Sequence, residues 1–100
     1  MNTIPDSAGA ILCPSGDVVA DSETELRRRL RELVASGVRK LTIDLSNVQM
    51  MDSAGLGLLI AAHNSLSKSG GELTVIHATH DLLELFRTMR MHQHFSISGE

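Results

Sequence analysis

The spacing of hydrophobic residues along this chain changes between the period of a strand and the period of a helix. Residues 40–45 read KLTIDL, in which Leu41, Ile43 and Leu45 alternate with polar side chains. A period of two predicts a strand with one buried face and one polar face. Residues 72–78, ELTVIHA, predict the next strand, and residues 94–98, HFSIS, predict a last short strand.

Three other segments have the spacing of amphipathic helices. In the first, Ser22 precedes Glu25 by the three residues of a capping box, and hydrophobic residues follow at i, i+4, i+7 and i+8. The second helix is expected from about Ser53 to Lys68, and the third after Thr79 as its N-cap. The apolar stripes are Leu26, Leu30, Leu33 and Val34 in the first helix, Leu56, Leu59, Ile60 and His63 in the second, and Leu82, Leu85, Phe86 and Met89 in the third.

Turn-forming residues mark the boundaries of these elements. The stretch Pro14–Asp17, read PSGD, predicts a turn between two short strands at residues 8–13 and 18–20. Gly37 is expected to end the first helix, and the glycine pair after Lys68 the second. Because strands that are joined through a helix pair in parallel, this order predicts a single α/β domain. Its sheet is expected to be small and mixed, with helices mainly on one face.

The composition of the chain argues against some classes of binding partner. The chain of 100 residues has the size of one domain, carries a formal net charge of −3 and holds only two aromatic residues, both Phe. Few rings for stacking and no excess of positive charge argue against a nucleic-acid partner. Four arginines, at positions 27–29 and 31, alternate with the leucines of the first helix. They form the solvent face of that helix or, alternatively, a docking patch for an acidic partner.

The same composition favours a cytoplasmic chain. Met1–Asp6 has neither the basic residues nor the apolar stretch of a signal peptide. The longest apolar run, Leu56–Ala62, is far shorter than the roughly 20 residues of a membrane span, so no direct membrane insertion is expected. Cys13 is the single cysteine and forms no internal disulfide. We expect the chain to be monomeric when it is free.

Residues 50–59, MMDSAGLGLL, connect a predicted strand to the second helix. Ser53 is expected to be the N-cap, with its hydroxyl accepting a hydrogen bond from the amide of residue 55 or 56. Gly55 and Gly57 then lie in the first turns, where each costs about 1 kcal/mol relative to Ala. Such a cost suggests that another backbone or a ligand comes close. The carboxyl end of a parallel strand is also where α/β folds place their binding crevice.

Through these residues the chain resembles the STAS domain family, the anti-sigma factor antagonists, whose members carry D-L-S-x-V-x-x-x-D-S-x-G-L-G. Its fixed positions hold Asp44-Leu45-Ser46, Val48, Asp52-Ser53 and Gly55-Leu56-Gly57, and the likeness extends over nearly the whole chain.

The resemblance implies a STAS-type fold, no cofactor and no catalysis by the chain itself. It implies that a partner anti-sigma factor, a serine kinase that uses magnesium ATP, phosphorylates Ser53 and thereby ends binding. A serine phosphatase is the expected third component. The residues expected at the partner surface are Asp17, Asp21, Asp52, Ser53, Ala54, Gly55, Leu56, Gly57 and Thr79.

The chain departs from the family's pattern at several positions. Val19 stands where many members have an acid, a role that Asp17 or Asp21 could take. Arg90 replaces a glycine that often closes the third helix. The chain stops at Glu100, where many members continue into a terminal helix.

Other functions fit the residues less well. A nucleophilic Ser53 would need a glycine two residues earlier, where Met51 stands, and no paired base is identifiable. A dinucleotide loop would need its third glycine at Ile60. The histidines lack the cysteines or clustered acids of a zinc site, so no metal is expected. The remaining alternative is a STAS subunit or regulatory module of a lipid-transport ABC system or other complex. In that role Ser53 is only a cap and no phosphoswitch operates.

Overall fold

The computed structural model describes residues 2–6, 9–14 and 20–99, and the side chains of residues 9–14 and 25–99. In chain order, the elements are β1 (Asn2–Asp6), β2 (Gly9–Cys13), α1 (Ala20–Ala35), β3 (Lys40–Asp44), α2 (Ser53–Lys68), β4 (Glu72–Ala78), α3 (His80–Thr88), the short 3-10 helix η1 (Met91–Gln93) and β5 (Ser96–Gly99). From β2 onward, the three long helices and the strands between them follow one another in the order that the hydrophobic pattern predicts.

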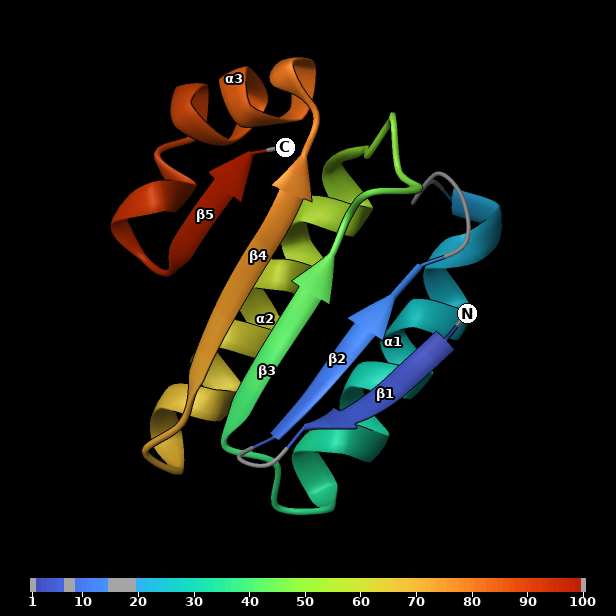
Figure 1. The fold of residues 1–100 in the computed structure, drawn as a ribbon, viewed down its shortest axis with the longest axis vertical. Helices are drawn as coiled ribbons and strands as arrows, with labels where there is room; N and C mark the ends of the chain where they lie inside the picture. The colour runs from blue at the N-terminus through green and yellow to red at the C-terminus, as the bar shows by residue number, and fades with distance from the viewer. Residues whose placement is uncertain (1, 7–8, 15–19, 100) are drawn as a thin grey trace.

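The described strands form one mixed sheet in the order β1-β2-β3-β4-β5 (Figure 1). β1 runs antiparallel to β2, whereas β2, β3, β4 and β5 are each parallel to their neighbours. A helix connects each parallel pair, because parallel neighbours need a long crossover between them. The predicted small mixed sheet is therefore confirmed.

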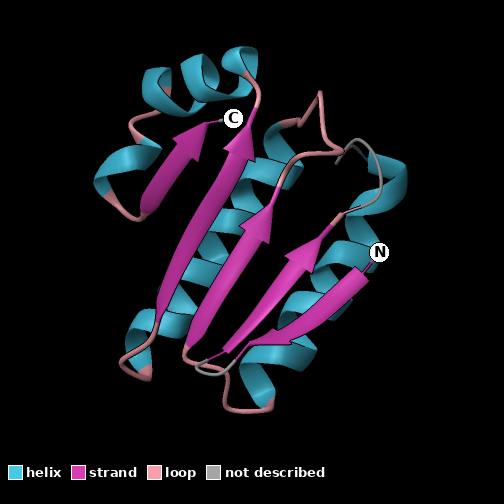
Figure 2. Cartoon of the chain, viewed as in Figure 1, coloured by secondary structure: helices cyan, strands magenta, loops and turns pink. Residues whose placement is uncertain are grey.

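The helices gather mainly on one side of this sheet (Figure 2). α1 and α2 lie against each other behind the sheet in this view, and α3 and η1 lie at its β4–β5 end. Between the sheet and the helices lies the core, where Leu12, Ile43, Leu59 and Val75 are all 0% exposed. Burial of apolar surface of this kind is the dominant favourable contribution to folding.

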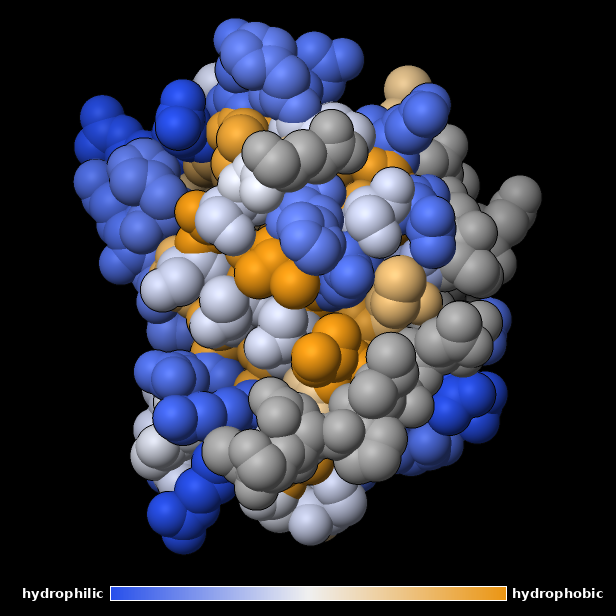
Figure 3. All heavy atoms as spheres, viewed as in Figure 1, coloured by the Kyte–Doolittle hydropathy of each residue, from blue (hydrophilic) through white to orange (hydrophobic). Residues whose placement is uncertain are grey.

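The opposite face of the sheet carries no helix among the residues that the structure describes (Figure 2). In β3, Leu41 and Ile43 are buried against the helices, whereas Thr42 and Asp44 on the other face are half-buried. This alternation is the one that the period of two predicts. Apolar and polar residues are mixed over the open face (Figure 3).

The N-terminal strand pair differs from the prediction. The antiparallel partner of β2 is β1. Of the strand predicted at residues 18–20, Ala20 begins α1, and residues 18–19 lie outside the described residues. The hydrophobic pattern missed β1 because Asn2–Asp6 holds polar residues and a proline, which an edge strand tolerates. The predicted capping box is also wrong, since α1 begins before Ser22. Residues 15–17 of the predicted turn lie outside the described residues.

The buried face of α2 is rotated relative to the predicted stripe. Leu59 is 0% exposed, as expected, but Ile60 is 36% exposed and His63 is half-buried. Ala62 and Leu66 are buried instead. Because α2 contacts both β4 and α1, its buried arc includes an alanine that a stripe of large apolar residues overlooks.

Candidate functional site

The connection from β3 to α2 is held against the core by its apolar residues. Leu45, Val48 and Met51 are buried, with exposures of 0%, 0% and 6%. The Leu45 amide donates a hydrogen bond to the Ile76 carbonyl at 3.0 Å, and the Val48 amide donates to the Leu45 carbonyl at 2.9 Å. Met50, by contrast, is 64% exposed. These contacts fix the path by which the chain enters α2.

The N-cap of α2 is Asp52. It has φ −91° and ψ −178°, and its Oδ1 accepts a hydrogen bond from the Gly55 amide at 3.0 Å. Ser53 is the first residue of the helix and is exposed. The prediction that Ser53 caps α2 is therefore wrong. Both residue types cap well, and the carboxylate one residue earlier reaches the same amide, which leaves the serine hydroxyl out of the capping bond.

The next four residues of the predicted partner surface divide into two exposed and two buried positions. Ala54 and Gly57 are exposed, whereas Gly55 and Leu56 are buried. A Cβ atom built at Gly57 would meet no heavy atom within 4 Å. Packing within the described chain therefore does not require glycine at this position. Gly55 and Leu56 are buried beneath this surface and are not exposed on it.

The remaining predicted residues belong to other helices or lie outside the described residues. Thr79 is the N-cap of α3, and its hydroxyl accepts a hydrogen bond from the Leu82 amide at 3.2 Å, which confirms the predicted cap. Asp17 lies outside the described residues, and Asp21 belongs to α1, with its side chain outside them. The structure thus brings residues 52–57 together as one candidate site. A role of the other three in partner binding stays a prediction.

A polar contact beside this loop joins the ends of β3 and β4. His77 Nδ1 lies 3.0 Å from Asp44 Oδ1, and the Ser46 amide donates to the same oxygen at 2.9 Å. Burial alone would raise the pKa of Asp44, but the hydrogen bonds from Ser46 and His77 outweigh it and hold this pKa below its ordinary value. His77 has a φ of 58° within a register shift between Val75 and Ala78. Sequence reasoning missed the pair because an irregularity in a strand leaves no periodic signal.

Neither a metal centre nor a membrane span is found in the described part of the chain. No three His, Cys, Asp or Glu side chains there are grouped as metal ligands. None of the described helices is long and apolar enough to cross a bilayer. The chemical groups at the start of α2 are the Ser53 hydroxyl, the Asp52 carboxylate and the backbone amides of the first turn.

Comparison with known proteins assigns the chain to a family. A family model described as "Mlab, STAS domain" matches residues 6–97. The chain belongs to the STAS domain family. This STAS domain is 33% identical over 72 residues to the anti-sigma-B factor antagonist of Bacillus subtilis (strain 168), which covers 72% of the chain and 65% of that protein. It is 33% identical over 55 residues to the anti-sigma F factor antagonist of Paenibacillus polymyxa, covering 49% of the chain and 47% of that protein.

These sequence matches span less than two thirds of the length of either relative. Solved structures match over nearly the whole STAS domain. An anti-sigma factor antagonist from Mycobacterium paratuberculosis has a TM-score of 0.88 at 22% identity, covering 99% of this chain and 84% of that one. The phosphorylated form of the Bacillus cell fate determinant SpoIIAA has a TM-score of 0.77 at 14% identity, covering 99% and 91%. This likeness confirms the predicted STAS-type α/β fold.

One departure of this STAS domain from the family's pattern has a structural outcome. α3 ends at Thr88, with Met89 as its C-cap, and Arg90 follows with φ 57° and ψ 28°. This is the left-handed conformation that glycine adopts without strain. The end of the helix is therefore kept, although a residue with a Cβ atom stands there. Val19, another departure from the pattern, lies outside the described residues.

Proposed function

We propose that this STAS domain is an anti-sigma factor antagonist that works as a phosphoswitch. Its unphosphorylated form binds an anti-sigma factor that is a serine kinase, phosphorylation of Ser53 ends the binding, and a serine phosphatase restores it. The kinase supplies the base, the magnesium ion and the nucleotide, so the antagonist itself performs no catalysis. The observation that carries the proposal is the exposed Ser53 at the first position of α2, with the capping bond made by Asp52.

The start of α2 suits a phosphorylated side chain. The amides of a first helical turn carry the positive end of the helix dipole, and no acidic residue lies in the first turn of α2. A phosphate on Ser53 adds about −1.5 to −2 charges beside the Asp52 carboxylate. The fold can hold this group at its surface, so phosphorylation changes the charge of the site without unfolding the domain.

The exposed residues around Ser53 suit a protein partner. Met50 is 64% exposed and offers a large apolar side chain. Ala54 and Gly57 are small and exposed, and a Cβ atom at Gly57 would meet nothing within 4 Å. A partner backbone can therefore come close to this turn. A phosphate on Ser53 would occupy that space and repel an acidic partner surface, which favours release.

The names of the relatives support an antagonist. Two curated relatives are named as anti-sigma factor antagonists, and one structural neighbour is a phosphorylated form. The matching family model carries the name Mlab and no word for an antagonist. The alternative of a subunit in a lipid-transport ABC system or other complex, without a phosphoswitch, is therefore kept as an outcome of the test.

Incubation of the purified chain with its cognate anti-sigma factor kinase and magnesium ATP, followed by mass mapping, tests the proposal. We expect phosphate on Ser53, none after Ser53→Ala, and unchanged modification after Ser67→Ala, an exposed serine near the other end of α2. Ser53→Ala should keep kinase binding, and Ser53→Asp should weaken it by about tenfold or more. Equal binding by both variants, or phosphate on another residue, would contradict the phosphoswitch. The transport-subunit alternative would then be favoured.

A further inference from the structure

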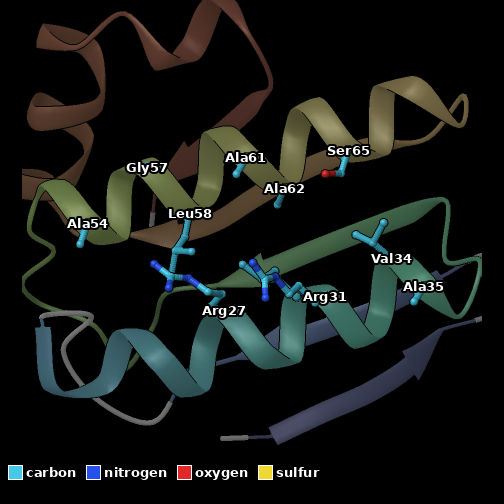
Figure 4. Close-up of a pocket in the computed structure, with 11 residues that line it drawn as sticks. Arg27, Arg31, Val34, Ala35, Ala54, Gly57, Leu58, Ala61, Ala62 and Ser65 are labelled. Carbon is cyan, nitrogen blue, oxygen red and sulfur yellow. The ribbon is translucent and has the colours of Figure 1, made fainter.

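An open groove of about 650 Å³ lies between α1 and α2 (Figure 4). Its floor is apolar and includes Leu30 of α1, which is 4% exposed, and Leu58 of α2, which is 8% exposed. Its wall on α2 is made only of small, exposed residues, namely Ala54, Gly57, Ala61 and Ser65.

The packing of the described chain does not explain this small-residue wall. Its members follow one another at steps of three or four residues, so they line one helix face over about 16 Å. A solvent-facing helix surface ordinarily carries long polar side chains, and this one carries none. A Cβ atom at Gly57 would meet no atom within 4 Å. The wall therefore leaves room for the close approach of a third helix, whose axis would pass about 8–10 Å away.

The opposite wall of the groove is basic. Arg27 and Arg31, one helical turn apart on α1, are exposed and extend toward α2 (Figure 4). Arg28, on the same helix but outside the groove, is paired with Glu32 at 3.2 Å. None of the described residues that line the groove is acidic. The complementary charge for Arg31 would thus come from an occupant of the groove, which favours the interpretation of the arginines as a docking patch for an acidic partner.

We propose that this groove binds an amphipathic helix of the anti-sigma factor, with an apolar stripe against Leu30 and Leu58 and with carboxylates against Arg31. The small wall admits the helix backbone, the floor takes its apolar side chains, and the basic wall selects acidic side chains. This inference rests on the proposed function, because it names how the same partner is held.

The position of the groove links it to the phosphoswitch. Ala54, at one end of the groove, directly follows Ser53 in the helix. An acidic helix in the groove therefore ends beside the phosphorylated position. A phosphate there sets about −1.5 to −2 charges against the carboxylates of that helix. Phosphorylation then repels the occupant of the groove in addition to filling the space above Gly57.

Two matched pairs of variants test the groove in binding titrations with the purified cognate kinase. Ser65→Phe fills the groove at the end away from Ser53, whereas Ser67→Phe places the same side chain on α2 outside the groove. Arg31→Glu reverses the charge of the groove wall, and Arg28→Glu reverses a charge outside it. We expect the two groove variants to weaken binding by about tenfold or more, and the two controls by less than about twofold.

The outcomes separate the groove from the phosphoswitch. Unchanged affinity in both groove variants, with phosphate-sensitive binding of the unaltered chain, overturns the groove and leaves the proposed function intact. Weakened groove variants with binding that phosphate does not affect support the groove and overturn the phosphoswitch. A chain that does not bind the kinase at all overturns both. Arg31→Glu keeps the test valid if Ser65→Phe fails to fold, which circular dichroism detects.

Cross-linking identifies the occupant directly. A photoreactive maleimide is attached to Ala61→Cys in a chain whose single cysteine is removed by Cys13→Ser, with Ser67→Cys as the control outside the groove. We expect position 61 to capture an acidic helical segment of the kinase, and phosphorylation of Ser53 to abolish the capture. Attachment to a second copy of this chain, or to a kinase segment without acidic residues, overturns the proposal.

Discussion

Helices α2 and α3 begin in the same way, yet only one of them carries the candidate site. Each follows a parallel strand, and each is capped by the side chain that precedes it. Asp52 accepts a hydrogen bond from the Gly55 amide at 3.0 Å, and Thr79 accepts one from the Leu82 amide at 3.2 Å. Capping chemistry alone therefore does not distinguish a functional helix terminus from a structural one.

The two helices differ in the surface that follows the cap. The first turn of α3 contains Asp81, which offsets the helix dipole, and His80 Nε2 lies 3.1 Å from Glu84 Oε1. The first turn of α2 has no acidic residue, and its exposed positions hold a serine and small residues. Each terminus thus has one carboxylate, Asp52 at the cap of α2 and Asp81 in the first turn of α3. The difference lies in the exposed surface, because the small residues that follow Ser53 in α2 leave space for another group.

The largest expected effects are losses of stability, and they test whether the buried side chains of both helices pack in the core. Leu59→Ala in α2 should lower the free energy of unfolding by about 2–5 kcal/mol, and Phe86→Ala in α3 by about 3–5 kcal/mol. Both side chains are 0% exposed. Ile60→Ala, the control at 36% exposure, should cost less than about 1 kcal/mol. Denaturant titrations measure all three, and equal losses for Leu59→Ala and Ile60→Ala would contradict the observed register of α2.

Substitution of the capping residues should distinguish the contribution of Asp52 to stability from that of Ser53. Asp52→Ala and Thr79→Ala should each lower the free energy of unfolding by about 0.5–2 kcal/mol, because each leaves a first-turn amide without its acceptor. Ser53→Ala should change it by less than about 0.5 kcal/mol, since its hydroxyl is outside the capping bond. Thermal unfolding of the three variants measures the difference. A loss for Ser53→Ala as large as for Asp52→Ala would assign the cap to Ser53 after all.

The same two helices show how much of the fold is predictable from sequence. The bounds of α2 at Ser53–Lys68 and of β4 at Glu72–Ala78 were predictable because hydrophobic period, turn residues and capping residues agree there. The cap of α2 was not, because Asp52 and Ser53 both cap well and the path of the loop decides between them. β1 was missed because a polar edge strand with a proline has no hydrophobic alternation.

The candidate site was predictable only as a motif. Its division into buried Gly55 and exposed Gly57 depends on how α2 packs against its neighbours, which a glycine in a sequence does not indicate. The contact between His77 and Asp44 depends on an irregularity in β4. The groove depends on the placement of α1 beside α2, so the arginines of α1 had two interpretations until that placement was known.

The residues that follow the C-terminal ends of the two helices should respond to substitution with changes in stability of opposite sign. α2 is followed by Gly70 at φ 79° and α3 by Arg90 at φ 57°. In Arg90→Gly the relief of left-handed strain, about 1–2 kcal/mol, exceeds the entropic cost of glycine, about 0.5–1 kcal/mol. We expect a gain of about 0.5–1 kcal/mol for Arg90→Gly and a loss of about 1 kcal/mol for Gly70→Ala. Changes of the same sign in thermal unfolding would show that backbone strain does not decide these positions.

The smallest expected effect concerns the contact that connects the strands leading into the two helices. Asp44 ends β3, and His77 of β4 lies 3.0 Å from it. Hydrogen bonds hold the pKa of Asp44 in the folded protein below its ordinary value. The stabilisation is therefore present above the ordinary pKa of an aspartate and is lost as the pH falls through the lower pKa of the folded state. Asp44→Asn should remove this part of the acid destabilisation. His77→Asn, which tolerates the positive φ, should remove only part of it, because the Ser46 amide still donates to Asp44. Thermal unfolding at a series of acid pH values measures these losses, and identical pH profiles for all three proteins would show that the contact contributes nothing to stability.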